Sequence, residues 1–233
     1  MKAVILAAGK GERLGNVTQT TPKPMLPIFD KPVLEHNIEM CKRFGIVDIY
    51  INLHYMSQVF KDFLGDGKKW GVSILYSEES ELLGTAGAVK KLSSELKEEP
   101  FFVIYGDNYF PKNYNLNKIC QKHRNNQPDM SIAFFQLEDV RLSGIAVLDD
   151  RDWVSQFIEK PQRATAVSDW VNAGLYLMEP QLLASIPDGY CDFGREVIPQ
   201  FLEAGKKILG VRMKSKVVAI DTPKLLKIAM SNQ

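Results

Sequence analysis

Cysteine is scarce in this sequence. Its 233 residues contain three, Cys41, Cys120 and Cys191, and no two of them form a C-x-x-C pair. An odd and widely spaced set argues against a disulfide framework and is typical of a reducing compartment. Long apolar runs are missing as well, since none approaches the ~18 residues that a membrane span needs. The chain opens on a short apolar strand rather than a signal peptide. We therefore expect a cytoplasmic protein with no membrane partner.

An excess of charge of one sign is also missing. The 29 basic and 28 acidic residues leave a formal net charge of +1, which gives no broad field for nucleic acid. Hydrophobic residues make up 45% of the chain and charged residues 24%, as in ordinary soluble globular proteins. The length suits one domain with a sizeable core. Nucleic acid is therefore not an expected partner, and anion binding must depend on a local cluster of basic residues.

Strand-like and helix-like patterns alternate through the first half of the chain. Apolar runs predict strands at 3–6, 47–52, 72–76 and 101–105, and the stretches between them predict helices at 32–44 (capped by Asp30), 58–64 and 84–96. This alternation predicts βαβ units and a parallel sheet. Later strands are expected closer together, at 130–137, 145–148, 153–159 and 170–178, with helices at 116–124, 195–204 and 224–230. We therefore expect an α/β fold with a central mixed sheet, in a single domain of two lobes.

The first chemical feature follows the first strand. Ala3 to Leu6 runs straight into Gly9, Gly11 and Gly15, interleaved with basic residues that include Arg13. Glycines let the backbone turn sharply and bring N–H groups against an anion such as a polyphosphate. An ordinary strand-to-helix turn that is basic explains the glycine spacing equally well. The stretch lacks the Gly-Lys-Ser/Thr of a P-loop, and Leu14 stands where the third glycine of G-x-G-x-x-G would fall.

A second feature is Gly106-Asp107-Asn108, directly after the apolar run 101–105. A carboxylate at the carboxyl end of a central strand lies where open α/β sheets bind ligands, and it is a hard oxygen ligand of the kind that Mg²⁺ requires. Taken alone, Asp107 is explained as well or better by a turn cap.

Two blocks near the amino terminus carry a family resemblance. Leu6-Ala7-Ala8-Gly9-Lys10-Gly11-Glu12-Arg13-Leu14 and Thr21-Pro22-Lys23-Pro24 resemble, in order and spacing, the signature of the sugar-1-phosphate nucleotidyltransferases. The resemblance implies a Rossmann-like three-layer fold with a mostly parallel sheet. It implies one domain over 1–233, with a nucleotide-binding half at 1–110 and a sugar-phosphate-binding half at 111–233. We expect no β-helix domain after it.

The resemblance also implies roles for individual residues. Arg13, Lys23 and Asp107 would be catalytic, with Asp107 also a ligand of Mg²⁺. The nucleotide would be bound by the loop and by the Leu-Gly-Thr-Ala-Gly block, whose helix would aim free N–H groups at the ligand; the residues are Leu6, Ala7, Ala8, Gly9, Gly11, Arg13, Lys23, Gly84 and Thr85. Glu78, Glu79 and Glu81, just before that block, are expected to form a solvated acidic turn rather than to be catalytic.

Three later blocks resemble the family's sugar-phosphate site. They are Glu159-Lys160-Pro161, Asn172-Ala173-Gly174 and the strand that begins at Gly144. In such enzymes the lysine contacts the phosphate of the sugar, and the others line the sugar pocket. The implied site residues are Gly144, Glu159, Lys160, Asn172 and Gly174.

The chain departs from the family pattern near its end. Relatives carry Asp-x-Gly-Thr-Pro, whose aspartate is the second metal ligand, whereas this chain has Ala219-Ile220-Asp221-Thr222-Pro223. Aligned without a gap, Ala219 takes the metal position. With a two-residue deletion, Asp221 takes it, and we prefer this alignment because a lost carboxylate would leave Mg²⁺ underbound.

The resemblance implies transfer of a nucleotidyl group from a nucleoside triphosphate to a sugar 1-phosphate, with release of pyrophosphate. The blocks lean to GTP and a hexose or heptose 1-phosphate, with dTTP, UTP and CTP left open. The alternatives are a cytidylyltransferase for a non-sugar phosphate such as phosphocholine, and a catalytically silent regulatory homologue. Association of such subunits is common in the family, so a homo-oligomer is also considered.

Overall fold

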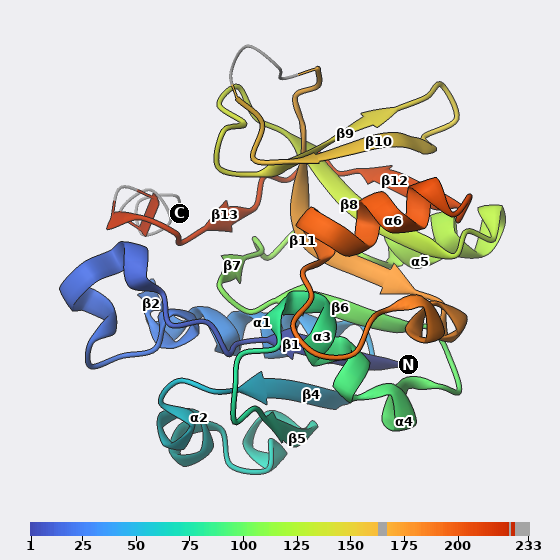
Figure 1. The fold of residues 1–233 in the computed structure, drawn as a ribbon. Helices are drawn as coiled ribbons and strands as arrows, with labels where there is room; N and C mark the ends of the chain where they lie inside the picture. The colour runs from blue at the N-terminus through green and yellow to red at the C-terminus, as the bar shows by residue number, and fades with distance from the viewer. Residues whose placement is uncertain (163–166, 224, 227–233) are drawn as a thin grey trace. The chain divides into compact units, whose positions relative to one another are not determined.

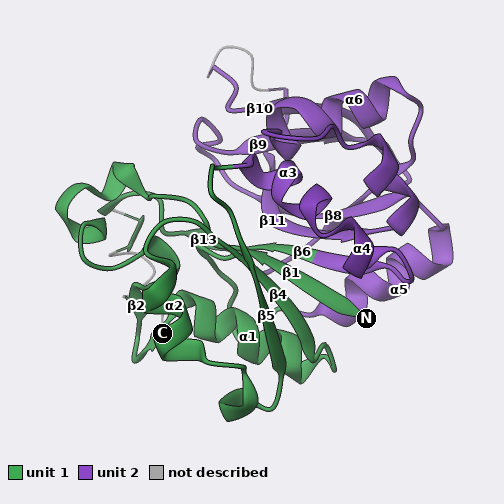
Figure 2. Ribbon diagram, turned by 60° about the horizontal axis from the view of Figure 1, so that its bottom comes forward, with its two compact units in different colours: residues 1–82, 103–114, 217–233 green, residues 83–102, 115–216 purple. Residues whose placement is uncertain are grey.

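The computed structural model describes residues 1–162, 167–223 and 225–226 (Figure 1). The chain divides into two compact units that do not follow the two sequence halves (Figure 2). Unit 1 contains residues 1–82, 103–114 and 217–233, and unit 2 contains residues 83–102 and 115–216. Each unit is therefore assembled from segments far apart in sequence. The expected helix at 224–230 falls mostly outside the described residues.

Unit 1 is built on parallel strands. β1 (Lys2–Leu6) pairs with β4 (Asp48–Leu53), which pairs with β5 (Ser73–Glu78), and the register aligns Leu6 with Asn52. β1 is also neighbour to β6 (Phe101–Tyr105), a strand that crosses from unit 2 into unit 1. Almost all apolar residues of β1 and β6 are buried, which explains why both strands are continuous hydrophobic runs in the sequence.

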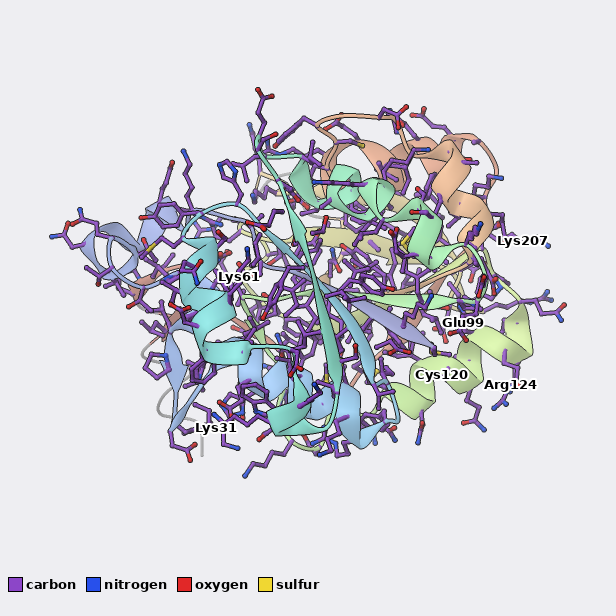
Figure 3. All side chains as sticks on the ribbon, turned by 90° about the horizontal axis from the view of Figure 1, so that it is seen from below. Lys31, Lys61, Glu99, Cys120, Arg124 and Lys207 are labelled. Atoms are coloured by element: carbon purple, nitrogen blue, oxygen red, sulfur yellow. The ribbon has the colours of Figure 1, made fainter. Side chains whose placement is uncertain are left out.

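Helices and short pairs of strands complete unit 1. The helices are α1 (Val33–Arg43) and α2 (Ser57–Leu64), with 3₁₀ turns at Glu12–Thr18, Lys23–Met25 and Lys68–Trp70. The short strands β2 (Pro27–Ile28) and β3 (Lys31–Pro32) pair with each other, as do β7 (Asn108–Tyr109) and β13 (Val218–Ala219). Lys61 of α2, labelled in Figure 3, donates to Glu78 of β5 at 2.6 Å. The expected cap Asp30 is wrong, because Pro32 occupies the N-cap of α1 without a side-chain bond.

Unit 2 is mostly antiparallel. β11 (Trp170–Met178) pairs antiparallel with β8 (Met130–Gln136) and with β9 (Gly144–Leu148), and β9 pairs with β10 (Val154–Glu159). β12 (Ile208–Arg212), which the sequence pattern did not predict, joins β8 in parallel. Parallel pairs in unit 1 and antiparallel pairs in unit 2 confirm the expected α/β fold with a mixed sheet.

Two of the helices expected in unit 2 are broken up, whereas the third extends two residues further than expected. The stretch 84–96 divides into α3 (Gly84–Lys91) and α4 (Ser93–Leu96), and α5 spans Leu116–Asn126. The stretch 195–204 becomes a π-helical turn, Phe193–Val197, followed by α6 (Ile198–Glu203), and a 3₁₀ turn covers Pro180–Ser185. No helix among the described residues is long and apolar enough to cross a membrane.

Candidate active site

The loop after β1 begins with a backbone hydrogen bond that the sequence did not predict. The Ala7 N–H donates to Asn52 Oδ1 at 2.7 Å, and Asn52 Nδ2 donates to Glu79 Oε1 at 2.7 Å. Glu79 is only 6% exposed, so it does not belong to a solvated acidic turn. This polar chain across the ends of β1, β4 and β5 fixes the start of the loop, and it occupies the Ala7 N–H. Leu6 ends β1, and Ala8 is buried beside Ala7.

Gly9 and Gly11 differ in what surrounds them. Gly11 has a φ of +69°, and a Cβ there would lie 3.0 Å from Lys23 Cβ and from Thr18 Cγ2. Thr18 Oγ1 also bonds the carbonyl of Gly11 at 3.1 Å. Gly11 is thus required by the turn itself. A Cβ on Gly9 would meet nothing within 4 Å, so neither packing nor a positive φ requires glycine there. Close approach of a ligand remains as a reason for Gly9.

Two cations and two carboxylates form a cluster next to this loop. Lys23 Nζ bonds both Asp107 and Asp221, and Arg13 contacts Asp221 at 3.0 Å. The Lys23 side chain is 8% exposed, whereas that of Arg13 is 51% exposed. Burial lowers the pKa of Lys23, but the charges of Asp107 and Asp221 and their hydrogen bonds outweigh it, so the pKa is raised. Lys23 is therefore a fixed positive charge, and Arg13 is open to a further anion.

Backbone contacts hold the two carboxylates in place. Gly106 N–H donates to Leu6 O at 2.9 Å, and a Cβ on Gly106 would lie 2.7 Å from that oxygen, so only glycine fits before Asp107. The Ile220 N–H donates to Asp107 O at 3.2 Å. Ala219 pairs with Asn108 in the β7–β13 ladder. Asp221 shares the Lys23 ammonium group with Asp107, and the gapped alignment that makes it the second metal ligand stays a prediction.

This pair of carboxylates fits a magnesium ion. Asp107 and Asp221 converge on one ammonium group, so their oxygens face a common point that a cation occupies. Mg²⁺ in proteins is typically held by one or two carboxylates, with phosphate and water completing its shell. Within the described ranges no group of three or more His, Cys, Asp or Glu is placed to hold a metal by itself. Phosphate oxygens and water would complete the shell of the ion.

In unit 2, the Gly84–Thr85 segment is engaged by the chain itself. The N–H groups of Ala86 and Gly87 both donate to Cys191 O, at 2.9 and 3.2 Å. A Cβ on Gly84 would lie 2.4 Å from the same oxygen, and one on Gly87 would lie 2.1 Å from Gly189 O. The expectation that this helix start aims free N–H groups at a ligand is wrong for these two residues. Close packing against residues 189–191 explains both glycines.

The predicted sugar-phosphate residues lie at the ends of β9 and β10 and within β11. Glu159 ends β10, and burial raises the pKa of its carboxyl, partly offset by Lys160, whose Nζ lies 3.6 Å from Glu159 Oε1. A Cβ on Gly144, the strand partner of Glu159, would lie 2.7 Å from Glu159 Oε2 and would displace that carboxylate. Lys160 adopts a φ of +49° and is 40% exposed along its side chain, which leaves its ammonium group accessible.

Asn172 and Gly174 form an irregularity in β11. The register with β8 shifts between Asn172 and Tyr176, and Gly174 has a φ of +65°. Asn172 Oδ1 accepts the Gly174 N–H at 2.9 Å, and Asn172 Nδ2 donates to the Tyr176 hydroxyl at 2.7 Å. The Asn-Ala-Gly block thus builds a β-bulge, a feature that re-aims side chains beside functional sites.

Comparison with known proteins identifies the family. The family model described as nucleotidyl transferase matches residues 2–217. A UTP–glucose-1-phosphate uridylyltransferase of Synechocystis sp. is 32% identical over 94% of this chain and 60% of that protein. A mannose-1-phosphate guanylyltransferase of Mycobacterium tuberculosis is 33% identical over 89% of this chain and 57% of that protein. The chain therefore spans less than two thirds of these curated relatives.

The crystal structure of HddC from Yersinia pseudotuberculosis, complexed with GMP-PN, has the same fold. It is 25% identical, with a TM-score of 0.83, and the match covers 98% of this chain and 97% of that one. The matched span includes the loop after β1, Lys23, Asp107 and the sugar-phosphate blocks. The chain belongs to the nucleotidyl transferase family.

Proposed function

We propose that this protein transfers a nucleotidyl group from a nucleoside triphosphate to a sugar 1-phosphate, giving a nucleotide sugar and pyrophosphate. The observation that carries the proposal is the cluster in which Lys23 joins Asp107 and Asp221 with Arg13 beside them. A catalytically silent homologue would not need two carboxylates and two cations placed together in this way. Family membership supplies the reaction class.

The residues suit a reaction that depends on position and charge. A phosphate oxygen of the sugar 1-phosphate attacks the α-phosphorus in line, and pyrophosphate leaves. Arg13, exposed beside the cluster, would bind the phosphates that depart, and its planar fork suits bidentate contact. Lys23 would neutralise the triphosphate, and Lys160 would hold the attacking phosphate. No general base is required, because that phosphate is already ionised at neutral pH.

Magnesium would be held by Asp107 and Asp221. When bound, it would supply positive charge at the phosphates, which adds to the charge from Arg13 and Lys23. The carboxylates themselves bring the region close to neutral when nothing is bound, since two acids face two bases.

The guanine nucleotide is the first candidate substrate. The guanylyltransferase relative and the GMP-PN complex support GTP, whereas the uridylyltransferase relative supports UTP. A hexose or heptose 1-phosphate is proposed as the acceptor. Phosphocholine with CTP is the alternative pair.

The test is pyrophosphate release with Mg²⁺, across GTP, dTTP, UTP and CTP and a panel of sugar 1-phosphates, with phosphocholine assayed beside them as the alternative acceptor. We expect release that needs both substrates and is greatest with GTP. Asp107→Asn should abolish it, while Asp66→Asn, at an exposed acid that pairs with Lys68, should not. Silence of folded protein across the panel, or full activity in Asp107→Asn, would overturn the proposal.

A further inference from the structure

Asp192 makes more contacts than a turn residue requires. Its Oδ1 accepts the N–H groups of Gly194 and Arg195, at 3.0 and 3.1 Å, and so caps the turn Phe193–Val197. Its Oδ2 accepts the hydroxyl of Thr85 at 3.0 Å, from a position 107 residues earlier in the chain. The same hydroxyl accepts the Phe193 N–H at 2.8 Å. Thr85 and Asp192 together therefore fix the turn to the first residues of α3.

The turn that Thr85 and Asp192 fix lies against the Glu159 carboxylate. A Cβ placed on Gly194 would lie 2.5 Å from Glu159 Oε2, and one on Gly144 would lie 2.7 Å from the same oxygen. The two glycine backbones therefore flank one carboxylate oxygen from two elements, the capped turn and β9. Since neither flank has a side chain that could yield, a shift of the turn changes the space available to Glu159 directly.

The charged groups around Glu159 agree with this placement. Burial raises its pKa most, Lys160 lowers it, Asp192 raises it and Arg195 lowers it. Two of these four influences come from the turn that Asp192 caps. Position of the turn thus affects both the space and the charge at Glu159.

We propose that Asp192 and Thr85 are positioning residues for Glu159, and that they link the Gly84–Thr85 segment to the sugar-phosphate residues of unit 2. The identity of the ligand beside Glu159 rests on the proposed function. The positioning of Glu159 by Asp192 and Thr85 does not depend on it. Thr85 of the Leu-Gly-Thr-Ala-Gly block would then help to bind the sugar 1-phosphate by positioning Glu159 through Asp192, rather than contact the nucleotide directly.

The kinetic test compares Thr85→Val, Asp192→Ala and Thr85→Ser. Valine keeps the shape and removes the hydroxyl, so we expect the KM for the sugar 1-phosphate to rise roughly tenfold, since small misplacements at a site have effects of up to about a hundredfold. The KM for the nucleoside triphosphate should change much less, and Thr85→Ser should stay near the unaltered protein. A KM for the nucleotide that rises as much as that for the sugar phosphate would overturn the inference.

Asn115→Ala provides the matched control. Asn115 caps α5 in the same unit by accepting the Asn117 N–H at 3.0 Å, so its loss removes one helix cap without changing the Asp192 turn. A rise in KM in Asn115→Ala equal to that in Asp192→Ala would show that loss of stability alone is responsible. In a Glu159→Gln background, adding Thr85→Val should bring little further change, and full additivity would contradict the proposed link.

A second measurement does not depend on the substrate. The pKa of the Glu159 carboxyl can be followed by NMR in protein with ¹³C-labelled glutamate. In Thr85→Val, where Asp192 keeps its charge, we expect this pKa to fall as a loosened turn admits water, with no change in Asn115→Ala. An unchanged pKa in Thr85→Val would overturn the structural part. A changed pKa without any transferase activity would leave the positioning intact and refute only the proposed reaction.

Discussion

Lys23 shows how one side chain can hold a site together. Its ammonium group joins Asp107 and Asp221, which are 84 and 198 residues away from it along the chain. Gly11 packs directly against its side chain, so the lysine also supports the loop after β1. Removing the charge would leave the two carboxylates without the cation that they share, and Arg13, which contacts Asp221, is half exposed.

Replacing Lys23 by methionine should abolish activity and lower the free energy of unfolding by about 3 kcal/mol, the low end for a broken buried pair because the carboxylates are partly exposed. Lys31→Met, which removes an exposed pair with Glu39, should leave both nearly unchanged. Urea unfolding of the two variants measures the change in the free energy of unfolding. Since the two carboxylates would then have lost the ammonium group that they share, added Mg²⁺ should stabilise Lys23→Met more than the unaltered protein. Equal stabilisation of both would argue against a shared cation position.

Glu159 gives a pH dependence of known sign. Burial raises its pKa in the folded protein above the usual 4.5, so folding favours the protonated carboxyl. Its contribution to stability is therefore complete below pH ~4.5 and is lost as the pH rises through the folded pKa. The unfolding free energy of the unaltered protein, minus that of Glu159→Gln, should fall with rising pH across this window. A difference that stays flat or increases would show that Glu159 is not desolvated.

Sequence reasoning found the residues that belong to contiguous blocks and missed their distant partners. Lys23 and Asp107 stand in recognisable motifs. Asn52 and Asp192 do not, because each acts on a segment 45 or 107 residues away. The polar Asn52 in an otherwise buried strand was the one available signal for the first.

At the scale of elements, glycine positions determine how segments pack. Gly87 lies inside α3, where alanine normally stabilises a helix by about 1 kcal/mol. Here its Cβ would lie 2.1 Å from a backbone oxygen of Gly189, which has no flexible end to move.

Gly87→Ala should therefore destabilise the protein, by roughly 1–3 kcal/mol, as overpacked positions do. Gly9→Ala should leave the unfolding free energy nearly unchanged, because nothing lies within 4 Å of its Cβ. If Gly9 approaches the nucleotide, the same substitution should raise the KM for the nucleoside triphosphate. Thermal unfolding and kinetics of the two variants distinguish packing from binding; a stable Gly87→Ala would refute the packing explanation.

Periodicity located most strands and helices of this chain, and the differences have local causes. The helix expected at 195–204 begins earlier because Asp192 caps Phe193–Val197. The stretch 84–96 is interrupted at Leu92, where the backbone leaves the helical region. β12 was not predicted. It pairs with β8, and the segments from β9 to α6 lie between the two strands in the sequence, so local sequence gives no sign of the pairing.

At the scale of the whole molecule, the expected halves 1–110 and 111–233 differ from the compact units. The chain passes between the units four times, after residues 82, 102, 114 and 216, and hydrophobic patterns do not encode such crossings. Ile220 illustrates the return: fully buried, it packs in unit 1 with residues from the start of the chain and from β7, namely Leu14, Leu26, Ile28, Val33 and Tyr109.

Ile220→Ala should lower the free energy of unfolding by about 2–5 kcal/mol, as other deletions in cores do. Hydrogen exchange should increase first in unit 1, including β7 and the loop after β1. Ile208→Ala, at an equally buried position of β12, should instead increase exchange first in β8 and α5 of unit 2. Identical exchange patterns in the two variants would show that the units do not open separately.

The late position of Asp221 has a consequence during synthesis on the ribosome. Lys23 emerges early and Asp107 midway, but the second carboxylate of the cluster emerges 198 residues after the lysine. Ile220, which belongs to an apolar cluster of unit 1, arrives at the same moment. A nascent chain therefore contains the loop after β1 long before it can complete the acidic pair. If the cluster has the role proposed above, fragments that end before residue 217 lack one of its carboxylates, so an interrupted translation product would not consume nucleotide.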